Sequence, residues 1–280
     1  MTTTNTTPAD VATEPRARFR DLVAAEWIKL RSLRSTWIAY GTTALAVIGL
    51  NAAIAYDTYS HWQQQTAAGR ADFVRDEIPL LEAFTANSAL IMMLAIGTLG
   101  ALTIIGEYST GTIRPTLAAV PARRSVMAAK VTVATAVTTV FGAFVATASF
   151  GLTQAILNGR GLGVSLAHPG AVRVVLASAL LAPVCALTGM ALGAVIRRTA
   201  ATMTASAALL VLVPLLLSDG RYWSAVAAHA TPHHAWLRLV TPHPNPTQFP
   251  WTTTGAWTVY AVWTLAAAAL AITSPHRRDQ

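Results

Sequence analysis

Residues 106–124, which read GEYSTGTIRPTLAAVPARR, decide the fold, because this polar stretch joins two long apolar segments. A polar hairpin between two membrane helices must lie in water at one face of the bilayer. Arg114, Arg123 and Arg124, with Lys130 just beyond them, put an excess of positive charge close to helix ends. Such an excess marks the cytoplasmic face of a membrane protein. We therefore predict a cytoplasmic hairpin here.

A short amphipathic helix is expected within this hairpin. Pro115 can open a helix, since it has no N–H to leave unpaired in a first turn, and Pro121 ends it. Ile113, Leu117 and Val120 then fall on one face, at positions i, i+4 and i+7. A short helix with one apolar face at the membrane surface has a shape suited to docking into another protein.

The composition is that of a membrane protein. Of 280 residues, 54% are hydrophobic and only 11% are charged, whereas an ordinary soluble domain has about 25% charged residues. The net charge of +8 is spread among the polar segments, so topology explains it better than a nucleic-acid partner does. The single cysteine, Cys185, lies in an apolar segment, which excludes intrachain disulfides and thiolate metal sites.

Six segments are long and apolar enough to cross about 30 Å of hydrocarbon. We predict membrane spans at residues 36–56, 84–106, 126–152, 171–196, 200–217 and 255–272. Residues 57–83 are expected to form a polar loop between the first two spans. The polar tails are residues 1–18, predicted to be disordered, and residues 273–280.

The outer loop, residues 218–250, holds one apolar stretch, residues 222–230, that is too short to cross a bilayer. We interpret this stretch as a re-entrant or interfacial helix. Residues 241–250 contain four prolines and are expected to be extended.

Residues 19–35 are predicted to form an amphipathic helix before the first span. Phe19, Val23, Trp27 and Leu30 recur near helical spacing, with charged residues on other faces. A helix of this kind lies in the membrane interface, in contact with lipid. A helix packed on its own chain remains the alternative, because amphipathic helices usually face a core.

Six spans place both termini on one side of the membrane. Of the 20 Lys and Arg residues, 14 fall on that side and six on the other, so both termini are predicted to be cytoplasmic. The fold class is an all-α polytopic membrane protein, with an N-terminal amphipathic helix and six transmembrane helices in the plasma membrane.

The span cores hold no Asp, Glu, Lys or Arg, which argues against an ion-coupled carrier. Asn51 and Asn87 are the most polar residues near these cores, and either could form hydrogen bonds between helices. Gly189 and Gly193 have the small-xxx-small spacing that lets two helices approach closely. Packing within the chain and a dimer interface both remain open for this pair.

Histidines in the outer loop raise the question of a metal site. Pro232 interrupts the helix that would align His229 with His233, and His234 and His243 follow at irregular spacing. A structural zinc ion takes four ligands, so we predict no metal site and interpret these histidines as solvated or facing lipid headgroups.

No motif for ATP binding or catalysis is present. A phosphate-binding loop ends in Gly-Lys-Ser/Thr, and the only two lysines, Lys29 and Lys130, are followed by Leu30 and Val131. The chain also lacks a nucleophile elbow and a metalloprotease helix. We therefore expect no enzymatic activity and no cofactor on this chain.

Two runs of sequence resemble the permease subunits of ABC-2 type ATP-binding-cassette transporters, as found in high-GC Gram-positive bacteria. They are EWIKLRSLRSTW, residues 26–37, and GEYSTGTIRPTLAAVPARR, and the similarity in layout covers about residues 19–272. In that family an amphipathic "elbow" helix precedes six spans. A coupling helix between spans two and three rests on the nucleotide-binding subunit, and short re-entrant helices precede the last span.

The resemblance implies a homodimeric or heterodimeric permease that works with a separate ATPase, which binds ATP and Mg²⁺. The transported compound would be hydrophobic or amphipathic (a drug, antibiotic or lipid-like molecule), and the direction would be export. The implied ATPase contacts, on the coupling loop of residues 107–124, are Ile113, Arg114, Leu117 and Val120. The residues implied to position this loop are Glu107, Tyr108 and Gly111.

Alternatives to these assignments remain. Glu107 and Tyr108 could simply mark the membrane boundary, as an acidic and an aromatic residue at the headgroups. The chain could also be a membrane scaffold or immunity protein that transports nothing, or an ATP-independent channel or secondary carrier. Co-purification of an ATPase would distinguish a transporter subunit from a scaffold or immunity protein.

Overall fold

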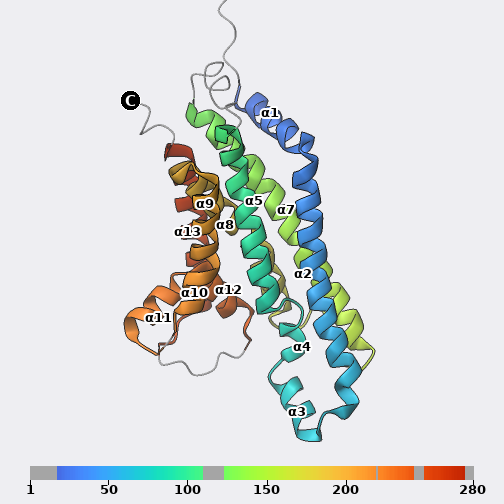
Figure 1. Cartoon of the computed structure of the whole chain (residues 1–280). Helices are drawn as coiled ribbons and strands as arrows, with labels where there is room; N and C mark the ends of the chain where they lie inside the picture. Colours follow the sequence, from blue (N-terminus) through green and yellow to red (C-terminus); the bar gives the residue numbers. More distant parts are fainter. Residues whose placement is uncertain (1–17, 110–122, 219, 243–248, 275–280) are drawn as a thin grey trace, which may run out of the picture.

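A computed structural model describes residues 18–109, 123–218, 220–242 and 249–274 of the chain. Within these residues all regular structure is helical (Figure 1). The helices are α1 (Phe19–Ser32), α2 (Arg34–His61), η1 (Trp62–Gln64), α3 (Ala67–Arg75), α4 (Ile78–Leu81), α5 (Ala86–Ser109), α7 (Arg123–Asn158), α8 (Ala171–Ile196), α9 (Thr199–Ala207), η2 (Ala208–Leu212), α10 (Val213–Leu216), α11 (Tyr222–His229), α12 (Pro232–Val240) and α13 (Thr253–Thr273).

Six of the described helical segments are long and apolar enough to cross a membrane. This finding confirms the predicted all-α membrane fold. The first and third spans are longer than expected, since α2 continues to His61 and α7 runs from Arg123 to Asn158. The fifth span is divided into α9, the π-helical segment η2 and α10.

The long helices form an elongated bundle with two distinct ends (Figure 1). One end, which we call the elbow end, gathers α1, the end of α5, the start of α7 and the end of α13. At this end the Ser274 hydroxyl donates to the Ala194 carbonyl of α8 at 3.2 Å. The opposite end, which we call the loop end, gathers α3, α4, α11 and α12 (Figure 1).

The expected polar loop at residues 57–83 is largely helical. Thr66 caps the start of α3, where its hydroxyl oxygen accepts a hydrogen bond from the Gly69 N–H at 3.1 Å. Phe73 of α3 packs edge-on against Trp62, with ring centroids 5.3 Å apart. This small apolar contact between two buried rings gives the loop a core of its own.

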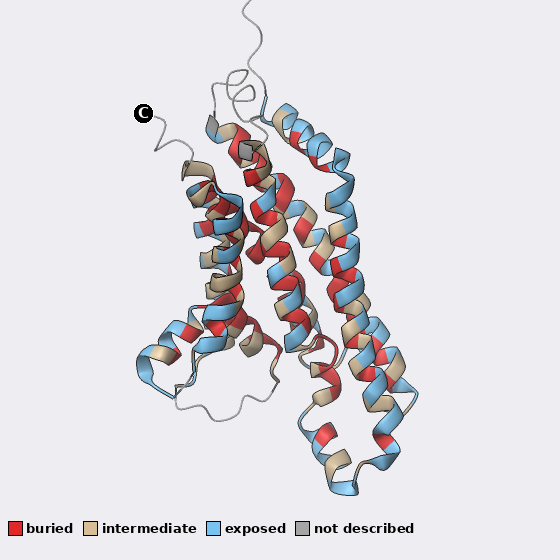
Figure 2. Ribbon diagram, viewed as in Figure 1, coloured by how far each residue is buried: buried red, intermediate tan, exposed pale blue. Residues whose placement is uncertain are grey.

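α8 is the central helix, and most of its residues are buried against α5, α7 and α13 (Figure 2). Glycines let α5 and α8 come together, because a Cβ at Gly189 would overlap the Gly97 carbonyl of α5. A Cβ at Gly193 would lie 3.1 Å from the Ala101 carbonyl. Gly189 and Gly193 therefore pack within the chain, against α5.

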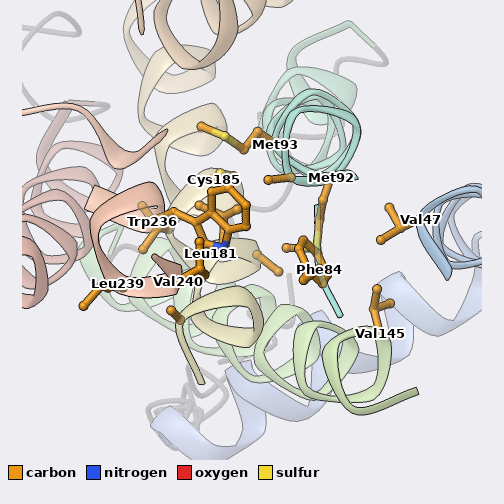
Figure 3. Close-up of a cluster of buried hydrophobic side chains, with 14 of the residues drawn as sticks. Val47, Phe84, Met92, Met93, Val145, Leu181, Cys185, Trp236, Leu239 and Val240 are labelled. Atoms are coloured by element: carbon orange, nitrogen blue, oxygen red, sulfur yellow. The ribbon is translucent and has the colours of Figure 1, made fainter. Parts of the chain in front are cut away.

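The main apolar core includes Trp236 of α12, which lies beside Leu181 and Cys185 of α8 (Figure 3). The Trp236 indole N–H donates to the Ser178 hydroxyl at 3.1 Å. Its ring also meets Phe84 edge-on, with centroids 6.0 Å apart. Trp236 thus connects the outer loop to α8 and to the segment before α5.

Asn51 joins three spans by hydrogen bonds in a fully buried position. Its amide donates to the Ser149 hydroxyl of α7 at 3.1 Å. Its carbonyl oxygen accepts from the Ser88 hydroxyl at 2.7 Å and from the Thr85 N–H at 3.1 Å, at the start of α5. The predicted interhelical role is confirmed for Asn51, whereas Asn87 is exposed.

The outer loop contains two short helices, α11 and α12, where the sequence analysis expected one. Pro232 does separate them, but it also occupies the first turn of α12, where a proline has no hydrogen bond to lose. Thr231 precedes it, and its hydroxyl oxygen accepts from the His234 N–H at 3.3 Å. Part of the expected extended stretch, residues 243–248, lies outside the described residues.

Candidate functional site

The predicted coupling hairpin has described flanks and an undescribed centre. α5 ends at Ser109 and α7 begins at Arg123, so the backbone of Tyr108 belongs to the last turn of α5. The centre, residues 110–122, lies outside the described residues. It contains the predicted site residues Gly111, Ile113, Arg114, Leu117 and Val120.

Four charged side chains from three helices meet beside these flanks, and we call them the ion cluster. Glu26 and Lys29 come from α1, Glu107 from the last turn of α5, and Lys130 from the second turn of α7. Lys130 Nζ donates to Glu26 Oε2 and, at 2.8 Å, to Glu107 Oε1. Lys29 Nζ donates to Glu26 Oε1 at 2.8 Å and to Glu107 Oε1 at 3.2 Å. Two ammonium groups thus neutralise two carboxylates.

The ion cluster has a buried half and an open half. The side chains of Lys130 and Glu26 are 8% and 6% exposed, whereas that of Lys29 is 44% exposed. A buried ion pair is much harder to break than an exposed one, because a lone charge left behind cannot be hydrated. The Lys130–Glu26 contact is therefore the part of the cluster on which the packing of α1 against α7 depends.

α1 presents Glu26 and Leu30 to the bundle and packs mainly on α7. Of the predicted elbow residues, Leu30 is buried, Val23 is half-buried, and Phe19 and Trp27 are exposed. The burial pattern of α1 fits both interpretations. One face packs on the chain, as expected of a helix that faces a core, and another face is apolar and exposed, as expected of a helix in contact with lipid.

Glu26 and Lys29 are both charged at neutral pH. Burial by itself raises the pKa of the Glu26 carboxyl, but the charge of Lys130 and the hydrogen bonds from Lys130 and Lys29 hold it below its usual value. Burial by itself lowers the pKa of Lys29, and its bonds to Glu26 and Glu107 raise it above its usual value. The lowered pKa of Glu26 stabilises the fold above about pH 4.5 and ceases to do so as the pH falls through its folded value.

Sequence reasoning missed the partnership of Glu26 with Lys130. The charge pattern assigns Lys130 to the hairpin, whereas the residue lies inside α7, within a candidate membrane span. In the sequence, the indication of this role is that Lys130 stands alone, seven residues into a helix whose remainder is an apolar segment. Glu107, predicted to position the loop, does accept hydrogen bonds from both lysines, and its effect on the hairpin stays a prediction.

The interpretation of the outer-loop histidines was wrong for His233, which is 5% exposed. The capped start of α12 turns His233 inward, where it lies beside Trp236 with ring centroids 6.4 Å apart. Neither ring nitrogen has a hydrogen-bond partner among the described residues. Burial, with a smaller effect of His234, lowers the pKa of His233 to about 4.

In the described part of the chain, no three His, Cys, Asp or Glu side chains could hold a metal ion together. The other histidines there therefore form no metal site with His233. His229 is half-buried and stacks on Trp251, with ring centroids 4.4 Å apart. His243 lies outside the described residues.

The chain is similar to a known protein family. A family model described as "ABC-2 family transporter protein" matches residues 22–214 of the chain, which is more than half of its length. The matched region includes the parts of α1, α5 and α7 that hold the ion cluster. No curated protein matches the chain.

Replacing Lys130 by Met tests the buried half of the ion cluster. The substitution breaks the buried pair and leaves only the more exposed Lys29 to bond to Glu26 and Glu107, which should cost about 3–5 kcal/mol of stability. Lys29→Met is the matched control, because the more exposed lysine should contribute less than about 1 kcal/mol. Thermal unfolding in detergent measures both, and equal losses in the two variants would show that burial does not distinguish them.

His233 should make the protein less stable in mild acid. The unfolded chain binds a proton near pH 6.5, whereas the folded chain does so only near pH 4, so stability should fall by up to about 3 kcal/mol as the pH drops through this window. His233→Phe should remove that part of the pH dependence. His61→Phe, at an exposed position, should retain it, and identical pH profiles for all three proteins would contradict the assignment.

Proposed function

Because the chain belongs to the ABC-2 family of transporter proteins, we propose that it is the permease subunit of an exporter whose ATPase is a separate protein. The family match and the six apolar helices support a multi-pass transporter permease. The observation that carries the proposed coupling is the ion cluster, in which Lys130 joins the flanks of the hairpin to each other and to α1.

The cluster suits the transmission of movement. A hairpin held only by its two peptide connections could bend on one flank without moving the other. Lys130 on α7 bonds to Glu107 on α5 and to Glu26 on α1, so displacement of the hairpin would carry three helices together. Both flanking helices pack on α8, and this contact is where their movement would reach the centre of the bundle.

The chemistry of ATP would belong to the partner. ATP and Mg²⁺ would bind to the ATPase, and the hairpin residues Ile113, Arg114, Leu117 and Val120 would receive its movement. Both lysines of this chain already serve the ion cluster. The permease would provide the path for a hydrophobic or amphipathic compound, together with a second permease copy of the same or another kind.

The elbow end would face the cytoplasm. The hairpin flanks, the start of α1 and the end of α13 lie at this end (Figure 1), and 14 of the 20 Lys and Arg residues belong to the segments assigned to it. An ATPase in the cytoplasm would then meet the hairpin directly.

Charging the hairpin tests this function. Leu117→Asp would replace an apolar docking side chain, whose burial is worth about 1.5–3 kcal/mol, by an unpaired carboxylate. Affinity for the ATPase should fall about 10- to 100-fold, so that the ATPase is lost on gentle purification and transport fails. A candidate ATPase, sought in the reading frames next to this one, would be co-expressed. Its recovery and the efflux of compound would be measured on the same cells.

Ser165→Asp is the matched control, since it adds the same charge at an exposed position near the loop end. It should retain both the ATPase and transport. If Leu117→Asp also retains both, the hairpin is not the coupling element. If an ATPase is bound but no compound is moved by the unaltered pair, the scaffold alternative gains support.

A further inference from the structure

An apolar groove of about 440 Å³ lies between α1, α2 and α7. Its volume falls within the roughly 300–1,000 Å³ of typical ligand pockets. Tyr40 packs against Phe141 and Trp37, with ring centroids 5.0 Å and 6.1 Å away, so the aromatic wall is continuous from α2 to α7. The groove is lined on α1 and α2 by Trp27, Trp37 and Tyr40, and on α7 by residues that include Ala136, Val140 and Phe144.

The groove opens on the outer surface of two candidate spans, the ones formed by α2 and α7, where Val140 and Phe144 are exposed. Trp37 and Tyr40 occupy the first two turns of α2, next to the elbow. On α7 the lining extends from Ala136 to Phe144, a length of about 12 Å along a helix. A groove that starts at the end of a span and runs into its apolar part faces hydrocarbon, so its occupant must be apolar.

Two lining tryptophans lie at the elbow side of this groove, and Arg31 and Arg34 each lie one helical turn from one of them, on the same helix face. Trp27 and Trp37 are 42% and 41% exposed, and within the described part of the chain their indole N–H groups have no hydrogen-bond acceptor. Arg31 and Arg34, at the bend from α1 to α2, are exposed and form no ion pair with a described residue. Indole N–H and guanidinium groups at a membrane interface can donate to phosphate and ester oxygens.

We propose that the groove binds one acyl chain of an anionic phospholipid, whose phosphate is held by Trp27, Trp37, Arg31 and Arg34. An apolar lining with cations at one end complements a molecule that has a hydrocarbon tail and a negatively charged head. Assigning this lipid to the cytoplasmic leaflet rests on the proposed orientation of the chain.

Such a lipid would act on the same helices as the ion cluster. α1 reaches α7 through Glu26 on its bundle-facing side, and Trp27, the next residue, lines the groove. A bound acyl chain would fill the space between α1, α2 and α7 from the membrane side. The elbow would then be held by ionic contacts on one side and by a lipid on the other.

Photo-crosslinking tests the site with the full chain. The purified protein is reconstituted in vesicles that contain phosphatidylglycerol with a diazirine group in its acyl chain, then irradiated, and the labelled residues are mapped by mass spectrometry. Label should concentrate on residues 136–144 and on the start of α2. Vesicles with the same diazirine chain on phosphatidylcholine should give several-fold less label there, because the zwitterionic head lacks the net charge that Arg31 and Arg34 attract.

Filling the groove should remove the label. Ala136→Trp and, independently, Val140→Trp place a large ring in the groove from positions that are exposed, so neither substitution disturbs the buried core. Each lipid methylene group that is no longer buried lowers the affinity of the lipid about fourfold. Displacing two methylene groups should therefore lower the labelling by about tenfold or more. Ala266→Trp, on the exposed face of α13, is the matched control and should leave the labelling unchanged.

Three results would overturn the proposal. Label spread evenly over the exposed faces of all spans would mean that no site exists. Equal labelling by phosphatidylglycerol and phosphatidylcholine would show that the site does not recognise the anionic headgroup. A cross-link from residues 136–144 to a second copy of the chain would make that copy the occupant. None of these readouts requires an ATPase or transport, so the outcome is independent of the proposed function.

Discussion

The positive charge of Lys130 constrains the whole elbow end of the protein. An ammonium group taken out of water loses several kcal/mol of hydration, and only well-placed carboxylates offset this loss. Lys130 obtains them from Glu26 of α1 and Glu107 of α5. The position of α1 is therefore tied to a charge in the third span, and the two flanks of the hairpin are held at a fixed separation at the same point.

Between the two ends of the bundle, packing and neutral hydrogen bonds hold the helices together. α8 meets α5 through glycines that permit backbone contact, and Asn51 connects α2, α5 and α7 through hydroxyl groups. The loop end is closed by Trp236, a large side chain that fills the core and pairs its only N–H with Ser178. The buried ion pair of the cluster thus lies where the proposed ATPase would act, whereas the ion pairs at the loop end, such as Arg75–Asp72, join exposed side chains.

Much of this architecture could be predicted because its signals are local. Hydropathy locates the six spans, and Asn51 is conspicuous as a polar residue in an apolar segment. The ion pair between Glu26 and Lys130 could not be predicted, since its members lie 104 residues apart and no periodicity connects them. The burial of His233 was missed for a related reason: Pro232 signals the end of one helix and the start of another equally well, and only tertiary packing turns α12 inward.

The central claim is that the ion cluster transmits movement of the hairpin to α1, α5 and α7. Glu26→Gln combined with Lys130→Met tests it most directly, because the pair is neutralised while the net charge and the Lys29–Glu107 ion pair are kept. The measurement is the amount of compound transported per ATP hydrolysed, in vesicles that contain the permease and its ATPase. We predict that the ATPase still binds and hydrolyses ATP while transport per ATP falls several-fold. An unchanged ratio, in a variant that folds and binds its partner normally, would contradict the claim.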